Sequence, residues 1–186
     1  MKRIILASGS PRRKELMSLT RLPFEVIVTD ADETVSDDLT PAQTVEILSR
    51  RKAEAIKEEG IIIGSDTVVA IGSEILGKPE DTKDAKRILK LLSGNTHQVY
   101  TGVTIIDGEN VDTFSVKTDV EFYPLTEEEI DEYISLTECY DKAGAYGIQG
   151  MGGLFVKSIT GDYNNVVGLP ISEVYRKLKK LQREHA

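Results

Sequence analysis

Apolar positions along the chain gather in short runs that are separated by polar turns. Ile4-Ile5-Leu6-Ala7 is uninterrupted and predicts a buried strand over residues 4–7, and a second short strand is predicted over 24–28. The run "IIIGSDTVVAIG" from Ile61 predicts a core strand that breaks at Gly64-Ser65-Asp66-Thr67 and then resumes. Apolar residues alternate on both sides of the turn at 107–110, which predicts a long hairpin.

The first helix is predicted to begin at Ser10-Pro11, because serine is a favoured N-cap and proline suits the first helical position. Leu16 and Leu19 supply its apolar stripe, with Leu22 as a candidate extension, and Pro23 stops it. The helix therefore follows the first strand after a short polar turn.

Later helices begin with capping-box patterns at Thr40 and Thr126, and the first of these is expected to run to Gly60. The remaining predicted elements are two helices, over 81–92 and from 170 onward, and two strands, over 154–159 and 163–167. Hairpins and βα units are interleaved and no repeat or linker is visible. The pattern predicts a single α/β domain over residues 1–186 with a mixed sheet.

Composition limits the classes of partner. The chain has 31 acidic and 23 basic residues, a formal net charge of -8, which opposes non-specific binding to nucleic acid or anionic membrane. The lone Cys139 cannot form an internal disulfide, which suits a reducing compartment. The run 4–7 is too short for a signal peptide or a membrane span. We expect a cytoplasmic protein without a membrane or stable nucleic-acid partner.

Three cations, Arg12, Arg13 and Lys14, stand at the start of the first helix. A helix start carries a partial positive charge and favours acidic residues. The cations are either solvated surface residues or part of a phosphate cradle, in which backbone N–H groups and guanidinium donors converge on one anion. The spacing of a Walker A loop is absent.

Asp66 lies inside apolar sequence on both sides. An unpaired buried carboxylate costs several kcal/mol, so Asp66 must be hydrogen-bonded, paired, or facing a cleft with a cation. It is either part of a β-bulge that bonds nearby backbone N–H groups or a general base or metal ligand at the end of a core strand.

Glu33, Lys52 and Lys78 are each ordinary surface charges when taken alone. As a set they supply a carboxylate for a divalent cation and ammonium groups for a polyphosphate, which phosphoanhydride cleavage needs. The two histidines, His97 and His185, lie far apart and form no zinc pattern with the single cysteine.

Long motifs in this chain resemble the Maf family of nucleotide pyrophosphatases, also known as septum-formation inhibitors. They are "LASGSPRRKEL" at 6–16, "GSDTVV" at 64–69, "LGKPED" at 76–81, "LSGNTHQVYTGV" at 92–103 and "DKAGAYGIQGMGGLFVKSITGDYNNVVGLP" at 141–170. The resemblance implies a fold similar to the inosine-triphosphate pyrophosphatases, with two lobes around an elongated mixed sheet and a central cleft for the nucleotide.

The same resemblance implies metal-dependent hydrolysis between the α- and β-phosphates of a nucleoside triphosphate, with Asp66 as proton acceptor. Arg12, Thr67 and Gln149 fall at positions that distinguish substrate branches, and here they resemble the branch that acts on dTTP and UTP. Modified pyrimidine nucleotides are a further option. The amide of Gln149 can match a pyrimidine carbonyl and N–H, and nearby glycines let the backbone approach the ring.

The resulting hypothesis assigns each candidate residue a role. Ser8, Arg12 and Arg13 hold phosphate oxygens, Lys52 and Lys78 neutralise the remaining charge, and Glu33 and Asp66 hold Mg²⁺ or Mn²⁺. A non-catalytic nucleotide-binding regulator of cell division is the main alternative. The sequence does not decide the oligomeric state, with a homodimer as one option.

Overall fold

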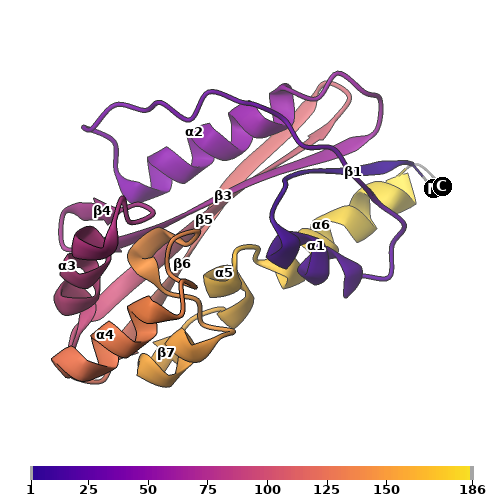
Figure 1. Ribbon diagram of the computed structural model, residues 1–186. Helices are drawn as coiled ribbons and strands as arrows, with labels where there is room; N and C mark the ends of the chain where they lie inside the picture. The colour runs from indigo at the N-terminus through magenta and orange to yellow at the C-terminus, as the bar shows by residue number, and fades with distance from the viewer. Residues whose placement is uncertain (1, 185–186) are drawn as a thin grey trace. The chain divides into compact units, whose positions relative to one another are not determined.

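The computed structural model describes residues 2–184, in which helices flank a seven-stranded mixed sheet (Figure 1). The strands are β1 Ile4–Ala7, β2 Glu25–Val26, β3 Ile61–Ile71, β4 Glu74–Leu76, β5 Thr96–Asp107, β6 Asn110–Phe122 and β7 Val156–Thr160. Their hydrogen-bonded order is β2-β1-β3-β5-β6-β7, with β4 paired to β3. This confirms the predicted α/β class, the mixed sheet and the long hairpin formed by β5 and β6.

The chain divides into two compact units. Unit 1 contains the described residues within Met1–Asp66, Thr101–Val116 and Gly168–Ala186, and unit 2 contains Thr67–Tyr100 and Lys117–Val167. The long strands β3, β5 and β6 contribute residues to both units. The organisation as one domain over residues 1–186 stays a prediction.

Unit 1 contains three parallel strands, β1, β2 and β3, together with the turn end of the β5–β6 hairpin. β1 pairs with β2 and with β3, and Ile4 to Ala7 are all buried. The helices of this unit are α1 Pro11–Ser18, α2 Pro41–Glu54 and α6 Ile171–Glu184. Ser10 caps α1 by accepting from the Arg13 N–H, and Thr40 opens α2 with a complete capping box, both as predicted.

Unit 2 contains α3 Thr82–Leu92, α4 Glu127–Ser135, the 3₁₀ turns η1 Ala143–Ala145 and η2 Met151–Phe155, and α5 Tyr163–Val167. The predicted capping box at Thr126 is present at the start of α4. A continuous apolar core joins α3, α4 and the sheet residues of this unit, with Leu89, Leu92 and Phe122 fully buried within it.

The predicted break in the core strand at Gly64-Ser65-Asp66-Thr67 is wrong, because β3 is continuous through these residues. The side chains of Ser65 and Asp66 have polar partners in the folded protein. The hydroxyl of Ser65 donates to the carbonyl of Gly168 at 3.4 Å, and Asp66 pairs with a lysine of α2. Satisfied polar groups can remain in an extended strand.

The predicted strand over 163–167 is also wrong, since these residues form α5. Asp162 explains the difference: its carboxylate accepts from the Asn164 N–H at 2.8 Å, and its carbonyl accepts from the Val166 N–H. An aspartate with these local bonds starts a helical turn even where the following residues favour strands.

Two helix boundaries also differ from expectation. Helix α1 ends at Ser18, and Leu19 is 66% exposed, so Leu19 does not belong to the buried stripe that Leu16 forms with Met17. Helix α2 ends at Glu54, before the predicted end at Gly60. Among residues 2–184, no helix combines the length and apolar composition that a membrane span needs.

Candidate active site

Helix α2 lies unusually close to the sheet of unit 1. A Cβ built on Gly64 of β3 would lie 2.1 Å from the carbonyl oxygen of Ser49, and one built on Gly102 of β5 would lie 2.2 Å from that of Val45. Only glycine permits such backbone contact. The close approach at Gly64 sets the next turn of α2, which carries Lys52, opposite the following part of β3.

Lys52 joins two carboxylates. Its Nζ lies 2.6 Å from Oδ1 of Asp66 and 2.9 Å from Oε1 of Glu33. The side chains of Lys52 and Asp66 are only 16% and 14% exposed, whereas that of Glu33 is 66% exposed. The carboxylate of Asp66 therefore belongs to a partly buried charge cluster.

Arg13 points inward from the start of α1. Its Nε donates to the carbonyl of Gly168 at 2.8 Å, and its guanidinium donates to the hydroxyl oxygen of Ser8 at 3.4 Å. Ser8 is itself buried, and its oxygen also accepts from the Ser10 N–H at 3.3 Å. These contacts exclude a plain solvated role for Arg13.

Charges around Arg13 connect the helix start with the carboxylate cluster. Burial lowers the pKa of the Arg13 guanidinium, Asp66 and Glu33 counteract this through their negative charge, and Arg12 adds to it. Arginine nevertheless remains charged in proteins, because its ordinary pKa lies far above neutral pH. Arg12 is half-buried at the same helix start. Unit 1 therefore brings five predicted residues into one electrostatic neighbourhood, with Ser8 supporting Arg13.

The three remaining predicted residues, Thr67, Lys78 and Gln149, belong to unit 2. The segments of the first two meet at Gly144, whose N–H donates to the carbonyl of Gly77 at 3.1 Å. A Cβ on Gly144 would lie 2.9 Å from the Val69 side chain, on the strand of Thr67. Thr67 is half-buried and Lys78 is exposed.

Gln149 is exposed on the glycine-rich segment 144–153. The glycines of this segment lie close to other parts of the protein. A Cβ on Gly150 would lie 2.5 Å from the carboxylate of Glu138, and one on Gly153 would lie 2.4 Å from the carbonyl of Ile148. The glycines here allow the segment to fold tightly while Gln149 faces outward.

Sequence reasoning missed the groups that support these residues. The Gly168 carbonyl accepts a hydrogen bond from Arg13, and Gly64 allows α2 to lie close to β3. Glycine has no functional side chain, so neither residue stood out as a candidate. The position of Gly64 inside an apolar strand was the available signal, because glycine inside a strand marks close backbone approach. His185 lies outside the described residues.

A divalent cation would find two carboxylates in unit 1, on Glu33 and Asp66. Within residues 2–184, no group of three or more histidine, cysteine or acidic side chains is placed to hold a metal ion. Mg²⁺ is commonly bound by one or two carboxylates together with substrate phosphates. The donor set fits such an ion, and the Lys52 ammonium shows that both carboxylates can face one cation.

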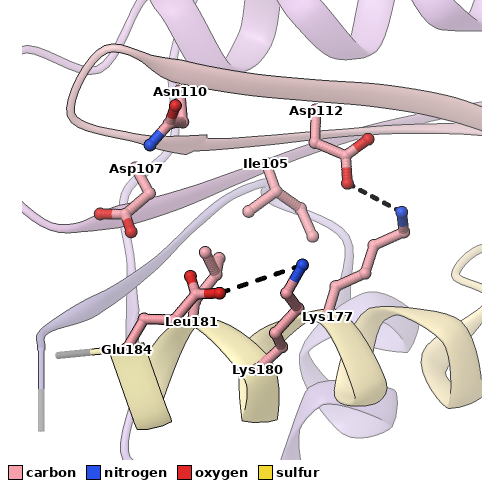
Figure 2. A pocket seen from close by; sticks show the side chains of 8 residues that line it. All are labelled: Ile105, Asp107, Asn110, Asp112, Lys177, Lys180, Leu181 and Glu184. Carbon is pink, nitrogen blue, oxygen red and sulfur yellow. Dashed lines mark hydrogen bonds and ion pairs between the residues drawn. The ribbon is translucent and has the colours of Figure 1, made fainter. Parts of the chain in front are cut away.

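A separate pocket of unit 1 does not contain the predicted residues. Figure 2 shows it beside α6, with Lys177 paired to Asp112 and Lys180 paired to Glu184. Its volume of about 180 Å³ is below the roughly 300 Å³ at which pockets for small molecules begin. This pocket is therefore not a candidate for a nucleotide site.

Fold and site together define an α/β protein with a cationic helix start beside a carboxylate–ammonium cluster, an arrangement suited to phosphate chemistry. A family model described as "Maf-like protein" matches residues 3–181, and the chain belongs to the Maf family. The predicted resemblance is thus confirmed.

Similar proteins cover nearly the whole chain. A Bacillus cytotoxicus protein named dTTP/UTP pyrophosphatase is 54% identical over 183 residues, covering 97% of this chain and 96% of its own. A Bacillus cereus protein of the same name is 52% identical with the same coverage. Among solved structures, the Staphylococcus aureus Ham1 protein matches 65% of this chain and 72% of its own at 17% identity, and its TM-score of 0.46 carries no further argument.

Proposed function

We propose that the protein is a nucleoside triphosphate pyrophosphatase that hydrolyses dTTP and UTP to the monophosphate and pyrophosphate. The carrying observation is identity above 50% over 97% of the chain with relatives that bear the name dTTP/UTP pyrophosphatase. The cation and carboxylate cluster of unit 1 supplies groups that suit this reaction. A purely regulatory nucleotide-binding role is not favoured.

The phosphates are proposed to bind at the start of α1. Arg12 and Arg13 donate to phosphate oxygens, together with backbone N–H groups of the helix start. Ser8 fixes the Arg13 guanidinium at 3.4 Å and keeps its own hydroxyl proton available as a donor. Lys52 and Lys78 neutralise further negative charge, which is the main demand of phosphoryl transfer.

Asp66 is proposed as the general base. It orients a water molecule and accepts its proton while the water oxygen bonds to the α-phosphorus. The bond from that phosphorus to the bridging oxygen breaks, and pyrophosphate leaves with the bond's electron pair. Lys52 lies 2.6 Å from Oδ1 of Asp66 and holds this carboxylate in place.

The base is proposed to be recognised by Gln149, with Arg12 and Thr67 contributing to the choice of substrate. The Gln149 amide has a donor and an acceptor, which complement the O4 acceptor and N3–H donor of uracil and thymine. Modified pyrimidine nucleotides that keep this edge are further candidate substrates.

Mg²⁺ or Mn²⁺ is proposed as cofactor, held by Glu33 and Asp66. Such an ion would neutralise charge on the phosphates as it develops during bond cleavage. The chain places the carboxylates of Glu33 and Asp66 so that both can contact one cation, and the Lys52 ammonium contacts both of them in the structure.

A substrate screen tests this function. The full chain is incubated with dTTP, UTP, dCTP, dATP and GTP in the presence of Mg²⁺ or Mn²⁺, and pyrophosphate and nucleotide products are quantified. We expect dTMP or UMP with equimolar pyrophosphate, and little product from the other nucleotides. Tight binding of dTTP without turnover under either metal would instead support the regulatory alternative.

Three further assignments belong to the same proposal. The protein acts in the cytoplasm, it forms no stable complex with nucleic acid because of its net charge of -8, and a homodimer is one assembly it adopts. Light scattering coupled to size-exclusion chromatography measures the oligomeric state. A DNA-binding assay at low salt tests whether the protein forms a complex with nucleic acid.

A further inference from the structure

Two aromatic hydroxyl groups hold the glycine-rich segment from within unit 2. The Tyr146 hydroxyl lies 2.7 Å from Nε2 of His97, and the Tyr133 hydroxyl accepts from the Gly147 N–H at 3.2 Å. Tyr146 and Gly147 are consecutive and lie two or three residues before Gln149. Both bonds therefore fix the backbone that leads directly to the exposed amide.

The two anchors are themselves immobilised by aromatic packing. His97 contacts the rings of Phe122 and Tyr146 edge to face, with centroids 4.9 Å and 5.4 Å apart. Tyr133 contacts Phe155 in the same way at 5.0 Å. Edge-to-face pairs of this kind add orientation to simple burial. The rings leave the hydroxyl groups few alternative positions.

Within residues 2–184, the His97 ring makes one hydrogen bond, to the Tyr146 hydroxyl. It is fully buried, and among the described residues its Nδ1 has no hydrogen-bond partner, whereas its Nε2 bonds the Tyr146 hydroxyl. Burial lowers the pKa of His97 to about 4, which keeps the imidazole neutral at pH 7. A neutral, buried imidazole with one partner acts as a fixed hydrogen-bonding group.

The segment has little space to adopt another path. A Cβ on Gly152 would lie 2.8 Å from the Gly147 carbonyl and 3.0 Å from the Tyr133 hydroxyl. The same hydroxyl thus bonds one side of the segment and limits the other. The glycines of the segment are tightly packed, whereas the Gln149 side chain is exposed.

We infer that His97, Tyr146 and Tyr133 are positioning residues for Gln149 and thereby set the selectivity for the base. The inference rests on the proposed function, in which Gln149 meets the pyrimidine. Correct placement matters because cytosine presents a donor where thymine presents an acceptor, so a displaced amide discriminates less well between them.

Tyr146→Phe and Tyr133→Phe test the inference, since each removes a single oxygen from a buried ring. Steady-state kinetics with dTTP and dCTP give kcat/KM for each nucleotide. We expect the ratio of kcat/KM for dTTP to kcat/KM for dCTP to fall on the order of tenfold in each variant. The main change should be a higher KM for dTTP, because a displaced Gln149 amide binds the base less well. Tyr140→Phe is the matched control, because its hydroxyl bonds Thr82 at 2.9 Å, outside this segment.

His97 supplies a second test with a conservative pair. His97→Gln keeps a polar group able to reach the Tyr146 hydroxyl, whereas His97→Leu removes it. We expect Gln to preserve more of the dTTP-to-dCTP ratio than Leu. Urea unfolding of every variant measures the folded fraction, which changes activity toward all nucleotides equally and leaves the ratio unaffected.

The outcomes separate this inference from the function on which it rests. A wild-type chain that hydrolyses no triphosphate contradicts the proposed function. A wild-type chain that is selective, with tyrosine variants that keep the same ratio or change kcat alone for both nucleotides, overturns the positioning role.

Discussion

The charged candidate residues of unit 1 and the exposed Gln149 of unit 2 are held by different kinds of interaction. In unit 1, Lys52 bridges Asp66 and Glu33 through charge, and Arg13 donates to a backbone carbonyl and a hydroxyl. In unit 2, Gln149 follows a segment fixed by neutral hydroxyl groups and crowded glycines. The residues compared in unit 1 carry charge, whereas Gln149 in unit 2 is a neutral amide whose position depends on how its segment packs.

The difference follows from the task proposed for each region. Charged side chains interact over several ångströms and can exchange partners, so a lysine that pairs with carboxylates can also respond to phosphate. A neutral amide discriminates between bases only through hydrogen bonds of defined direction. The chain therefore uses ion pairs around Asp66 in unit 1 and a tightly packed backbone beside Gln149 in unit 2.

Asp66→Asn is expected to have the largest effect. The amide keeps the shape but cannot accept a proton from water, so kcat for dTTP should fall about 10³-fold. Binding of dTTP, measured by calorimetry, should change far less. Asp112→Asn is the matched control, because Asp112 also pairs with a lysine, Lys177 at 2.8 Å, but lies beside the small pocket of Figure 2. Near-normal turnover in Asp66→Asn removes Asp66 from the mechanism.

His97 should make the stability of unit 2 depend on pH. The pKa of His97 is about 4 in the folded protein and about 6.5 in the unfolded chain. The unfolded chain therefore binds more protons between these values, and stability falls as pH drops from about 6.5 to about 4. The full contribution is about 3 kcal/mol. Urea unfolding at pH 7 and pH 4 should show a smaller difference in His97→Gln than in the wild type.

Carboxylates elsewhere titrate in both proteins, so only the difference between the two pH profiles reports on His97. If the free energy of unfolding changed with pH in the same way in the wild type and in His97→Gln, His97 would not be held neutral in the folded protein. The description of His97 as a neutral hydrogen-bonding group would then be wrong.

Gly64→Ala should disturb unit 1 through packing rather than charge. The new methyl group would meet the Ser49 carbonyl at 2.1 Å, so α2 must move. Overpacking of this kind costs about 2 kcal/mol of unfolding free energy. We also expect lower kcat, because Lys52 moves with the helix. Gly77→Ala is the control for stability, since a Cβ there meets nothing within 4 Å. Equal stabilities of the two variants would contradict the close packing of α2.

Arg3→Gln should have the smallest effect, although it removes two ion pairs of unit 1. Arg3 contacts Glu25 at 2.7 Å and Glu58 at 3.1 Å, but all three side chains are at least 40% exposed. Exposed ion pairs contribute little to stability because water screens them. Thermal unfolding should shift slightly and activity should stay unchanged. A large loss of activity would mean that charge matters throughout unit 1 and not only around Asp66.

Local signals in the sequence predicted much of the fold because they act over a few residues. Ser10, Thr40 and Thr126 cap helices as expected, and the alternating apolar residues around 107–110 form the β5–β6 hairpin. The α5 segment was misjudged because two bonds of Asp162 outweigh the strand preference of the valines that follow.

The candidate site was predictable only in part. Asp66 stood out as a carboxylate in apolar sequence, yet its partner Lys52 lies 14 residues earlier and is brought to it by the contact at Gly64. Tyr133 and His97 gave no local signal at all, since both look like ordinary core residues. Their role depends on which segment the fold places over them.

Hydrolysis of dTTP in ¹⁸O-labelled water tests the central claim most directly, because it shows which phosphorus the water attacks. Mass spectrometry of the products should find one ¹⁸O atom in dTMP and none in pyrophosphate. Release of dTDP with orthophosphate, or label in pyrophosphate instead of dTMP, would contradict attack at the α-phosphorus by a water that Asp66 activates.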